Sequence, residues 1–236
     1  MQTKVGRDPV TGNDDDAAAG ESENGQPNRG ESPISAPPER FNAAYYERYY
    51  LTPATQVMPA GIVGRLADFL LSYIRYLEIE VRHILEFGPG TGIMQDALRK
   101  RLPKAGYTGV ELSHFACAQY GWIHGSVADW TPPRSGPNLR ADLTICYDVL
   151  QYLCDADAMA ALKNLRAQSP ELLFFSAMTE ADMLQNCEPQ LTDSEVFLRT
   201  ADWYREPLRQ THRNLGGGLW LNRASDIVVF ELEYLE

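Results

Sequence analysis

The chain has 236 residues, of which 44% are hydrophobic, and a net charge of -11. That length and composition suffice for one sizeable core, or for one core with a small subdomain. The acidic balance argues against a protein that grips a nucleic-acid backbone, which would need a basic surface. No apolar run approaches the ~20 residues of a membrane span, so we expect no membrane partner.

The cysteines and the N-terminal stretch indicate where the protein works. The four cysteines form no C-x-x-C pair, and no histidine lies at zinc-finger spacing from them, so we expect no metal site. No secretory apolar region opens the chain. We therefore expect a cytoplasmic protein with reduced thiols.

Residues 1–38 differ in composition from the rest of the chain. They contain no aromatic residue, few aliphatic residues and the acidic run Asp14 to Asp16. Such a segment cannot bury enough apolar surface to offset the entropy lost on ordering. We expect a disordered acidic tail over 1–38 and a folded region over 39–236.

Two helices are predicted before the first strand. In the segment "ERFNAAYYERYY", helical spacing places Phe41, Tyr45 and Tyr49 on one face. A second helix is predicted over 63–78. Its expected apolar stripe is Ile62, Leu66, Phe69, Leu70, Ile74 and Leu77.

After these helices the pattern alternates between strands and helices. Strands are predicted over 83–87, 107–112, 122–124, 143–147 and 172–177, with helices over 92–102, 114–120 and 158–167. A further helix over 201–212 precedes two strands, over 219–222 and 227–234. Alternation implies right-handed βαβ units, and a terminal hairpin adds antiparallel strands. The prediction is a Rossmann-like α/β fold with a mixed seven-stranded sheet, helices on both faces, a terminal antiparallel hairpin and extra N-terminal helices.

The glycine-rich stretch "HILEFGPGTGI" is the strongest local signal. Gly88, Gly90 and Gly92 follow an apolar strand, as where a backbone closely approaches a ligand. A mononucleotide phosphate loop needs a lysine that is absent here. A dinucleotide loop needs G-x-G-x-x-G, and the third glycine arrives one residue early, which weakens a nicotinamide cofactor without removing it.

The run from Glu86 to Gly92 resembles the first motif of class I S-adenosylmethionine-dependent methyltransferases, in which an acidic residue precedes G-x-G-x-G. Glu111 ends the second strand 25 residues after Glu86. The segments "HGSVADW", "ADLTICYDVLQYL" and "RTADWYREPL" followed by "LGGGLWL" resemble later elements of the small-molecule members, in the same order. The resemblance runs from about residue 39 to the end.

The resemblance implies S-adenosyl-L-methionine as the cofactor. Glu86 would lie near its ammonium group, and Glu111 would accept hydrogen bonds from both ribose hydroxyls. Family members often have an acidic residue after the third strand's glycine; here Ser126 stands there, so Ser126, Val127 or Asp129 would meet the adenine. The residues expected to contact the cofactor are Glu86, Gly88, Gly90, Gly92, Glu111, Leu112, Ser126, Val127, Tyr147 and Tyr46.

The resemblance also divides the folded region. Residues 39–80 would form a helical cap, 81–180 the cofactor-binding half, and 181–236 an acceptor-side segment with the terminal hairpin. The stretch 185–203 would shape the acceptor pocket together with Trp203 and Tyr204. Asp148, at the end of the fourth strand, would either cap the following helix or approach the ligand.

These features lead to a hypothesis of methyl transfer to a small-molecule oxygen or nitrogen acceptor by in-line displacement, mainly through proximity and orientation. A base is needed only for a protonated acceptor, and no base is identified; the candidates are Tyr147, His124 and His212. The alternatives are a nicotinamide-dependent oxidoreductase and a cofactor-binding scaffold without turnover. A protein or RNA acceptor is disfavoured by the acidic charge and by the missing amino-methylation signature.

Overall fold

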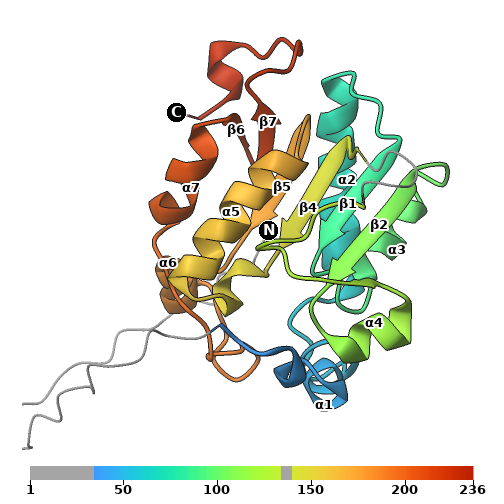
Figure 1. Cartoon of the computed structure of the whole chain (residues 1–236), viewed down its shortest axis with the longest axis vertical. Helices are drawn as coiled ribbons and strands as arrows, with labels where there is room; N and C mark the ends of the chain where they lie inside the picture. The colour runs from blue at the N-terminus through green and yellow to red at the C-terminus, as the bar shows by residue number, and fades with distance from the viewer. Residues whose placement is uncertain (1–34, 134–139, 236) are drawn as a thin grey trace, which may run out of the picture. The chain divides into compact units, whose positions relative to one another are not determined.

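A computed structural model of the chain describes residues 35–133 and 140–235 (Figure 1). Most of the segment expected to be a disordered tail lies outside the described residues. The described part of that segment contacts the fold: Ser35 Oγ accepts the Cys154 N–H at 2.9 Å, and the Ala36 N–H donates to the Tyr152 carbonyl at 2.9 Å. The folded region therefore begins no later than Ser35, four residues before the predicted boundary.

The sheet has seven strands in the order β3-β2-β1-β4-β5-β7-β6. All neighbours are parallel except the pairs β5–β7 and β7–β6, which are antiparallel. The strands are β1 His83–Phe87, β2 Gly106–Glu111, β3 Ile123–His124, β4 Leu143–Tyr147, β5 Leu172–Ser176, β6 His212–Gly216 and β7 Leu219–Asn222. The strand order reverses between β1 and β4, and ligands of open α/β sheets bind at such a point.

The mixed sheet is confirmed, but its terminal hairpin uses a different strand from the one predicted. β6 lies where a helix end was expected, and it joins β7 through Gly216, Gly217 and Gly218, which have φ of 82°, 56° and 84°. The predicted strand over 227–234 is wrong. That stretch is irregular apart from a 3-10 turn at Glu231–Glu233, because β6 already occupies the edge of the sheet beside β7.

Helices cover both faces of the sheet, as predicted (Figure 1). α2 and α3 pack on one face, and α5 and α7 pack on the other. The helices are α1 Ala43–Tyr46, α2 Ala60–Tyr76, α3 Ile93–Arg99, α4 His114–Tyr120, α5 Asp155–Gln168, α6 Glu180–Gln185 and α7 Ala201–Arg209. Short turns occur at Pro38–Arg40, Glu47–Leu51 and Leu150–Tyr152.

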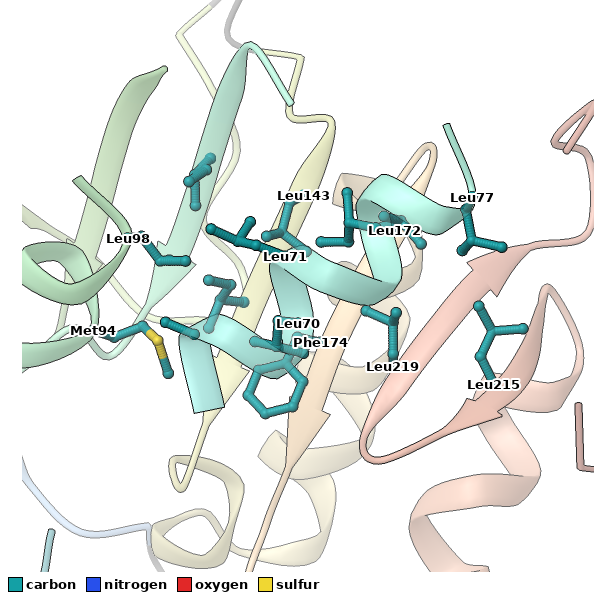
Figure 2. Packing of buried hydrophobic residues seen from close by; sticks show 14 of the residues in the cluster. Leu70, Leu71, Leu77, Met94, Leu98, Leu143, Leu172, Phe174, Leu215 and Leu219 are labelled. Atoms are coloured by element: carbon teal, nitrogen blue, oxygen red, sulfur yellow. The ribbon is translucent and has the colours of Figure 1, made fainter. Parts of the chain in front are cut away.

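The core beneath α2 covers one face of the sheet. Figure 2 shows Leu70 and Leu71 of α2 against Leu143, Leu172 and Phe174 of the central strands. The buried stripe of α2 is Val63, Ala67, Leu70, Leu71 and Ile74. The predicted stripe was partly wrong, since Ile62 and Phe69 are 44% and 46% exposed. Apolar residues surround more than half of this helix, so spacing alone could not select the face, and the small Ala67 allows close approach to the sheet.

The predicted helix over 39–50 begins later than expected: α1 starts at Ala43 and continues without a break into a π-helical turn that ends at Leu51. Asn42 caps α1 by accepting N–H groups from Ala44 and Tyr45, and a π-helical turn follows over Glu47–Leu51. The wider turn shifts the buried face. Tyr46 is therefore the most buried tyrosine of this segment, at 4% exposure, and it stacks on Phe115 of α4 with ring centroids 5.7 Å apart.

Candidate functional site

The glycine loop adopts a backbone that only glycine tolerates easily. Gly88, Gly90 and Gly92 have φ of 72°, 51° and 79°. A Cβ on Gly88 would lie 2.3 Å from Cγ2 of Val149, so a side chain there would clash as well as strain the backbone. The loop that follows β1 therefore lies directly against the turn after β4.

Gly88→Ala is expected to lower the free energy of unfolding by about 1–3 kcal/mol, from the strain of a left-handed alanine and the clash with Val149. Chemical denaturation measures this value. Gly64→Ala is the matched control, because Gly64 lies inside α2 and a Cβ there would meet nothing closer than 3.8 Å. That control should gain about 0.5–1 kcal/mol; an unchanged Gly88→Ala variant would show that the loop relaxes freely.

Trp122 supports the loop from behind, a role that the sequence analysis missed. Its indole N–H donates to the Gly90 carbonyl at 2.8 Å. A Cβ on Gly109 of β2 would lie 2.4 Å from the Trp122 ring, so this glycine makes room for the indole. The only sequence signal was a large aromatic residue just before a short strand.

Glu111 fastens the loop to the end of β2. Its Oε2 accepts the Gly90 N–H at 3.0 Å, and its Oε1 accepts the Ser113 N–H at 2.9 Å. Burial raises the pKa of this carboxyl, and the backbone N–H donors oppose that rise. A carboxylate oxygen accepts two hydrogen bonds, so each oxygen retains capacity for a ligand hydroxyl.

Glu86 is a buried carboxyl at the end of β1, with 3% exposure. Burial raises its pKa to about 7; the Tyr107 hydroxyl, which donates to it, opposes the rise, and Glu111 adds to it. Near neutral pH this group therefore stands between its neutral and charged forms. A cation beside it would favour the charged form.

These groups border a cavity of about 530 Å³ at the carboxyl ends of β1, β2, β4 and β5. In Figure 1 the N-terminal turns, α4 and α6 lie at this same lower end of the sheet. Nine of the ten residues expected to contact the cofactor line the cavity; Gly92 alone does not. Among the described residues that line it, none is a lysine, an arginine or a histidine.

The three candidate bases occupy different places. Tyr147 lines the cavity, and its hydroxyl donates to Sδ of Met58 at 3.7 Å. His124 lies outside it, exposed and stacked on His114 with ring centroids 4.3 Å apart. His212 is fully buried in β6, where its Nε2 lies 3.0 Å from the Ser169 carbonyl. Burial lowers the pKa of His212, as for a neutral structural histidine.

The acceptor-side stretch is only partly where it was expected. Residues between Asn186 and Asp193 line the cavity, but Trp203 and Tyr204 do not. Both pack around the buried Arg199, whose guanidinium lies 4.5 Å from the Trp203 ring centroid. Trp203 and Tyr204 therefore pack against the end of the 185–203 stretch and do not form part of the cavity wall.

Asp148 proves to be a cavity residue and not a helix cap. It has φ of 57°, and its N–H donates to the Ser176 carbonyl at 2.9 Å. Neither the turn at Leu150–Tyr152 nor α5 uses its side chain as a cap. Burial raises its pKa to about 7, and Asp182 adds to the rise. A non-glycine residue held in the left-handed region is often found at a functional site.

Other residues that line the cavity were not predicted from the sequence. They are Met58, Gln151, Tyr152, Met178 and Asp182. They come from four separate stretches of the chain, so no local spacing could have grouped them. Among residues 35–133 and 140–235, no three histidine, cysteine, aspartate or glutamate side chains gather to hold a metal ion. In the same residues no helix is long and apolar enough to cross a membrane.

No protein-family model matches the chain, and no curated protein sequence matches it. Solved structures do resemble it. The sugar N-methyltransferase KedS8 from Streptoalloteichus sp has a TM-score of 0.53 at 15% identity, over 86% of this chain and 98% of that one. Magnesium protoporphyrin IX methyltransferase from Synechocystis PCC 6803, solved with S-adenosylhomocysteine, has a TM-score of 0.52 at 14% identity, over 73% and 85%.

A third match is an O-methyltransferase family protein from Burkholderia thailandensis, with a TM-score of 0.47 at 13% identity. The match covers 71% of this chain and 59% of that protein, which is therefore much longer than the shared region. At these identities the comparisons establish the fold that the chain shares with methyltransferases. They leave the activity to be argued from the site.

Proposed function

We propose that the protein is an S-adenosylmethionine-dependent methyltransferase that acts on a small molecule with an oxygen or nitrogen acceptor. The observation that carries this proposal is the Glu111 carboxylate holding the N–H of Gly90 beside the cavity, at the strand-order reversal of the sheet. The structures of similar fold that bind S-adenosylhomocysteine support it.

The cavity suits that cofactor chemically. Glu86 is placed to receive the ammonium group, and the free lone pairs of Glu111 suit the two ribose hydroxyls. Ser126 and Val127 line the part of the cavity beyond β3, where adenine would lie. The Tyr46 ring contacts the loop, since a Cβ on Gly90 would lie 3.4 Å from it. A nicotinamide dinucleotide fits poorly, because its pyrophosphate would face carboxylates and no cationic side chain among the described lining residues.

The bound cofactor supplies a methyl group already activated on a sulfonium. The protein then has to orient the acceptor and exclude water. Well-oriented intramolecular reactions gain roughly 7–11 kcal/mol from such positioning. The glycine loop fixes one side of the reacting pair, and the N-terminal turns with the 186–193 stretch close the other. Tyr147 also lines the cavity, and its hydroxyl donates to Sδ of Met58.

Calorimetry with S-adenosylhomocysteine and with NAD tests the cofactor. We expect binding of S-adenosylhomocysteine and none of NAD; binding of NAD alone would overturn the proposal in favour of an oxidoreductase. Incubating a metabolite extract with isotopically labelled S-adenosylmethionine, followed by mass spectrometry, tests turnover. A chain that binds the cofactor but labels nothing would be a scaffold without turnover.

Glu111→Ala is expected to weaken S-adenosylhomocysteine binding by about 1–3 kcal/mol, because charge-assisted hydrogen bonds and the tether to Gly90 are lost. Calorimetry measures the affinity, and circular dichroism confirms that the variant is folded. Glu111→Gln keeps the shape of the side chain and one acceptor oxygen. Its affinity for S-adenosylhomocysteine should therefore lie between those of the wild type and Glu111→Ala. Unchanged affinity in Glu111→Ala would refute the ribose role.

The division of the chain is part of the same proposal. Residues 39–80 would cap the cavity, 81–180 would hold the cofactor, and 181–236 would shape the acceptor side. We also propose a cytoplasmic location. The four cysteines support it, because Cys117, Cys146, Cys154 and Cys187 are all free thiols.

A further inference from the structure

The cavity carries an excess of negative charge. Six carboxyl groups line the whole cavity: Glu86, Glu111, Asp148, Asp182, Glu188 and Asp193. S-adenosylmethionine brings a sulfonium, an ammonium and a carboxylate, a net single positive charge. The proposed function assigns Glu86 and Glu111 to the cofactor, so four carboxyl groups of the cavity remain without an assigned role.

For three of these four carboxyl groups, hydrogen bonds within the protein or contact with solvent stabilise the negative charge. Asp182 closes the cap of α6 by accepting from Thr179 and from Asn186. Asp193 accepts two hydrogen bonds from Arg40 Nη2, both at 2.7 Å. Glu188 is exposed to solvent. None of them needs a ligand to balance its charge.

Asp148 is the fourth carboxyl group, and it has no such stabilising contact. It is half-buried, and no described residue donates a hydrogen bond to its side chain or pairs with it. It directly follows β4, next to Tyr147 and level with the glycine loop after β1. An ionised carboxylate at such a place calls for a cationic partner, because its charge is partly removed from water.

Aromatic rings and a second unpaired polar group line the same cavity as Asp148. The rings are Tyr45, Tyr50 and Tyr152, with the Tyr45 and Tyr152 hydroxyls 2.9 Å apart, and Tyr50 and Tyr152 interact electrostatically with Asp148. Aromatic faces attract cations, most strongly where water is excluded. Gln151 also lines the cavity, is 3% exposed, and its buried Oε1 has no hydrogen-bond partner in the described structure. A buried acceptor without a donor among the described residues would be satisfied by a bound water or by a ligand that brings N–H groups.

We propose that the acceptor is a small amine that binds as its ammonium form, with the Asp148 carboxylate receiving the cation and then its proton. This inference rests on the proposed methyltransferase function and narrows its acceptor. An alcohol or phenol acceptor would bring no charge to Asp148. An anionic acceptor would meet carboxylates only.

The reaction balances with these groups alone. An ammonium N–H bond breaks, and the proton passes to an Asp148 carboxylate oxygen, which leaves a neutral amine with a lone pair. That lone pair forms a bond to the methyl carbon while the carbon–sulfur bond breaks, and its electron pair stays on sulfur. The products are a methylated ammonium ion and neutral thioether sulfur, and the protonated Asp148 releases its proton to solvent.

The surroundings of Asp148 favour proton transfer near neutral pH. The titratable groups that interact with it are Asp182 of α6, Cys187 after that helix, Tyr50 of the N-terminal turns, Tyr152 after β4, and Cys146 and Tyr147 of β4 itself. None of these is a cation. The pKa of Asp148, raised to about 7 by burial, makes it a better proton acceptor than an ordinary aspartate.

The first test uses two probes of equal shape and different charge, choline and 3,3-dimethyl-1-butanol, added to the complex with S-adenosylhomocysteine. Ligand-observed NMR measures both affinities. We expect choline to bind at least about tenfold more tightly, and Asp148→Asn to remove that preference. Asparagine tolerates left-handed backbone, so this variant keeps the turn. Asp202→Asn is the matched control and should retain the preference, because Asp202 on α7 is 70% exposed and does not line the cavity.

The possible outcomes distinguish failure of the proposed ammonium site from failure of the proposed methyltransferase function. Equal binding of the two probes, or an unchanged preference in Asp148→Asn, overturns the ammonium site while S-adenosylhomocysteine binding upholds the methyltransferase. Labelled methyl found on oxygen in the extract experiment also overturns it; label on nitrogen supports it. With the amine identified by label on nitrogen, Asp148→Asn should lower turnover by at least about 100-fold, with little change in S-adenosylhomocysteine affinity.

Discussion

Replacing Arg199 by methionine is expected to lower the free energy of unfolding by about 3–5 kcal/mol. Arg199 is 5% exposed, yet its guanidinium is fully engaged. It donates to the carbonyls of Leu150 at 3.2 Å and Leu153 at 2.5 Å, and to the Tyr204 hydroxyl at 3.1 Å. Methionine fills similar space but removes the donor to the Leu153 carbonyl, as well as one of the two donors to the Leu150 carbonyl, which still accepts the Leu153 N–H at 3.2 Å.

The other contacts of Arg199 add less to stability. The bond from its Nε to Asp155 spans 2.9 Å, but the Asp155 side chain is 76% exposed, so water screens that pair. Stacking on Trp203 contributes about 0.5–2 kcal/mol. The larger cost therefore arises from the hydrogen bonds lost at the Leu150 and Leu153 carbonyls. Both belong to the turn after β4, which also carries the cavity residues Gln151 and Tyr152.

Chemical denaturation measures this loss. Arg205→Met is the matched control, because Arg205 lies nearby on α7 and pairs with Asp202 across an exposed contact of 3.4 Å. That control should change stability by less than about 0.5 kcal/mol. Arg199→Lys should show most of the loss expected for Arg199→Met, since a lysine ammonium group cannot reach the same set of acceptors as the planar guanidinium group. Equal stability of Arg199→Met and Arg205→Met would contradict the anchoring role.

The parts of the fold that sequence predicted well are those that local chemistry decides. β1, β4 and β7 have the predicted bounds, because each is an apolar run closed by glycine or by a charged residue. The loop after β1 was predicted because its glycines need left-handed backbone. Glu111 was placed at the same site because its position at a strand end depends only on the pattern of that strand.

What the sequence did not predict depends on competition between distant segments. Residues 227–234 alternate as a strand does, but β6 holds the place beside β7, and Val228, Phe230 and Leu232 are 77%, 69% and 100% exposed. Asp148 could be a cap or a ligand contact until the structure brought α6 and the N-terminal turns around it. The contact of Trp122 with the glycine loop could not be predicted, because it depends on the space left by Gly109.

Glu86→Gln is expected to have opposite effects on stability and on cofactor binding. The pKa of Glu86 is raised from 4.5 to about 7 in the folded protein, mainly by burial. Between these two values the unfolded chain has released the proton that the folded protein keeps, so wild-type stability falls as pH rises from 4.5 to 7. At pH 8 without cofactor, the glutamine variant should therefore be more stable by about 2–3 kcal/mol. At pH 4 the two proteins should be equal.

Cofactor binding should respond in the other direction. S-adenosylhomocysteine retains the ammonium group, so wild-type affinity should rise between pH 6 and pH 8 as Glu86 ionises. Loss of one partner from a buried charged pair costs about 2–5 kcal/mol, so the variant should bind at least about 30-fold more weakly at pH 8. Its affinity should also lose that part of the pH dependence. Comparing wild type with Glu86→Gln at each pH cancels the contribution of Asp148, which titrates in the same range.

The opposite signs separate a ligand-binding carboxylate from a structural one. A carboxylate that serves the fold through the Tyr107 hydroxyl would make the variant less stable and weaken binding only through that loss. Thermal unfolding with and without S-adenosylhomocysteine at pH 8 measures both effects in one preparation, and Glu206→Gln, whose side chain is 70% exposed, is the control. A gain in stability with a loss of affinity means that the fold tolerates a buried charge there because the ligand needs it. A loss of both would assign Glu86 to the core of the sheet.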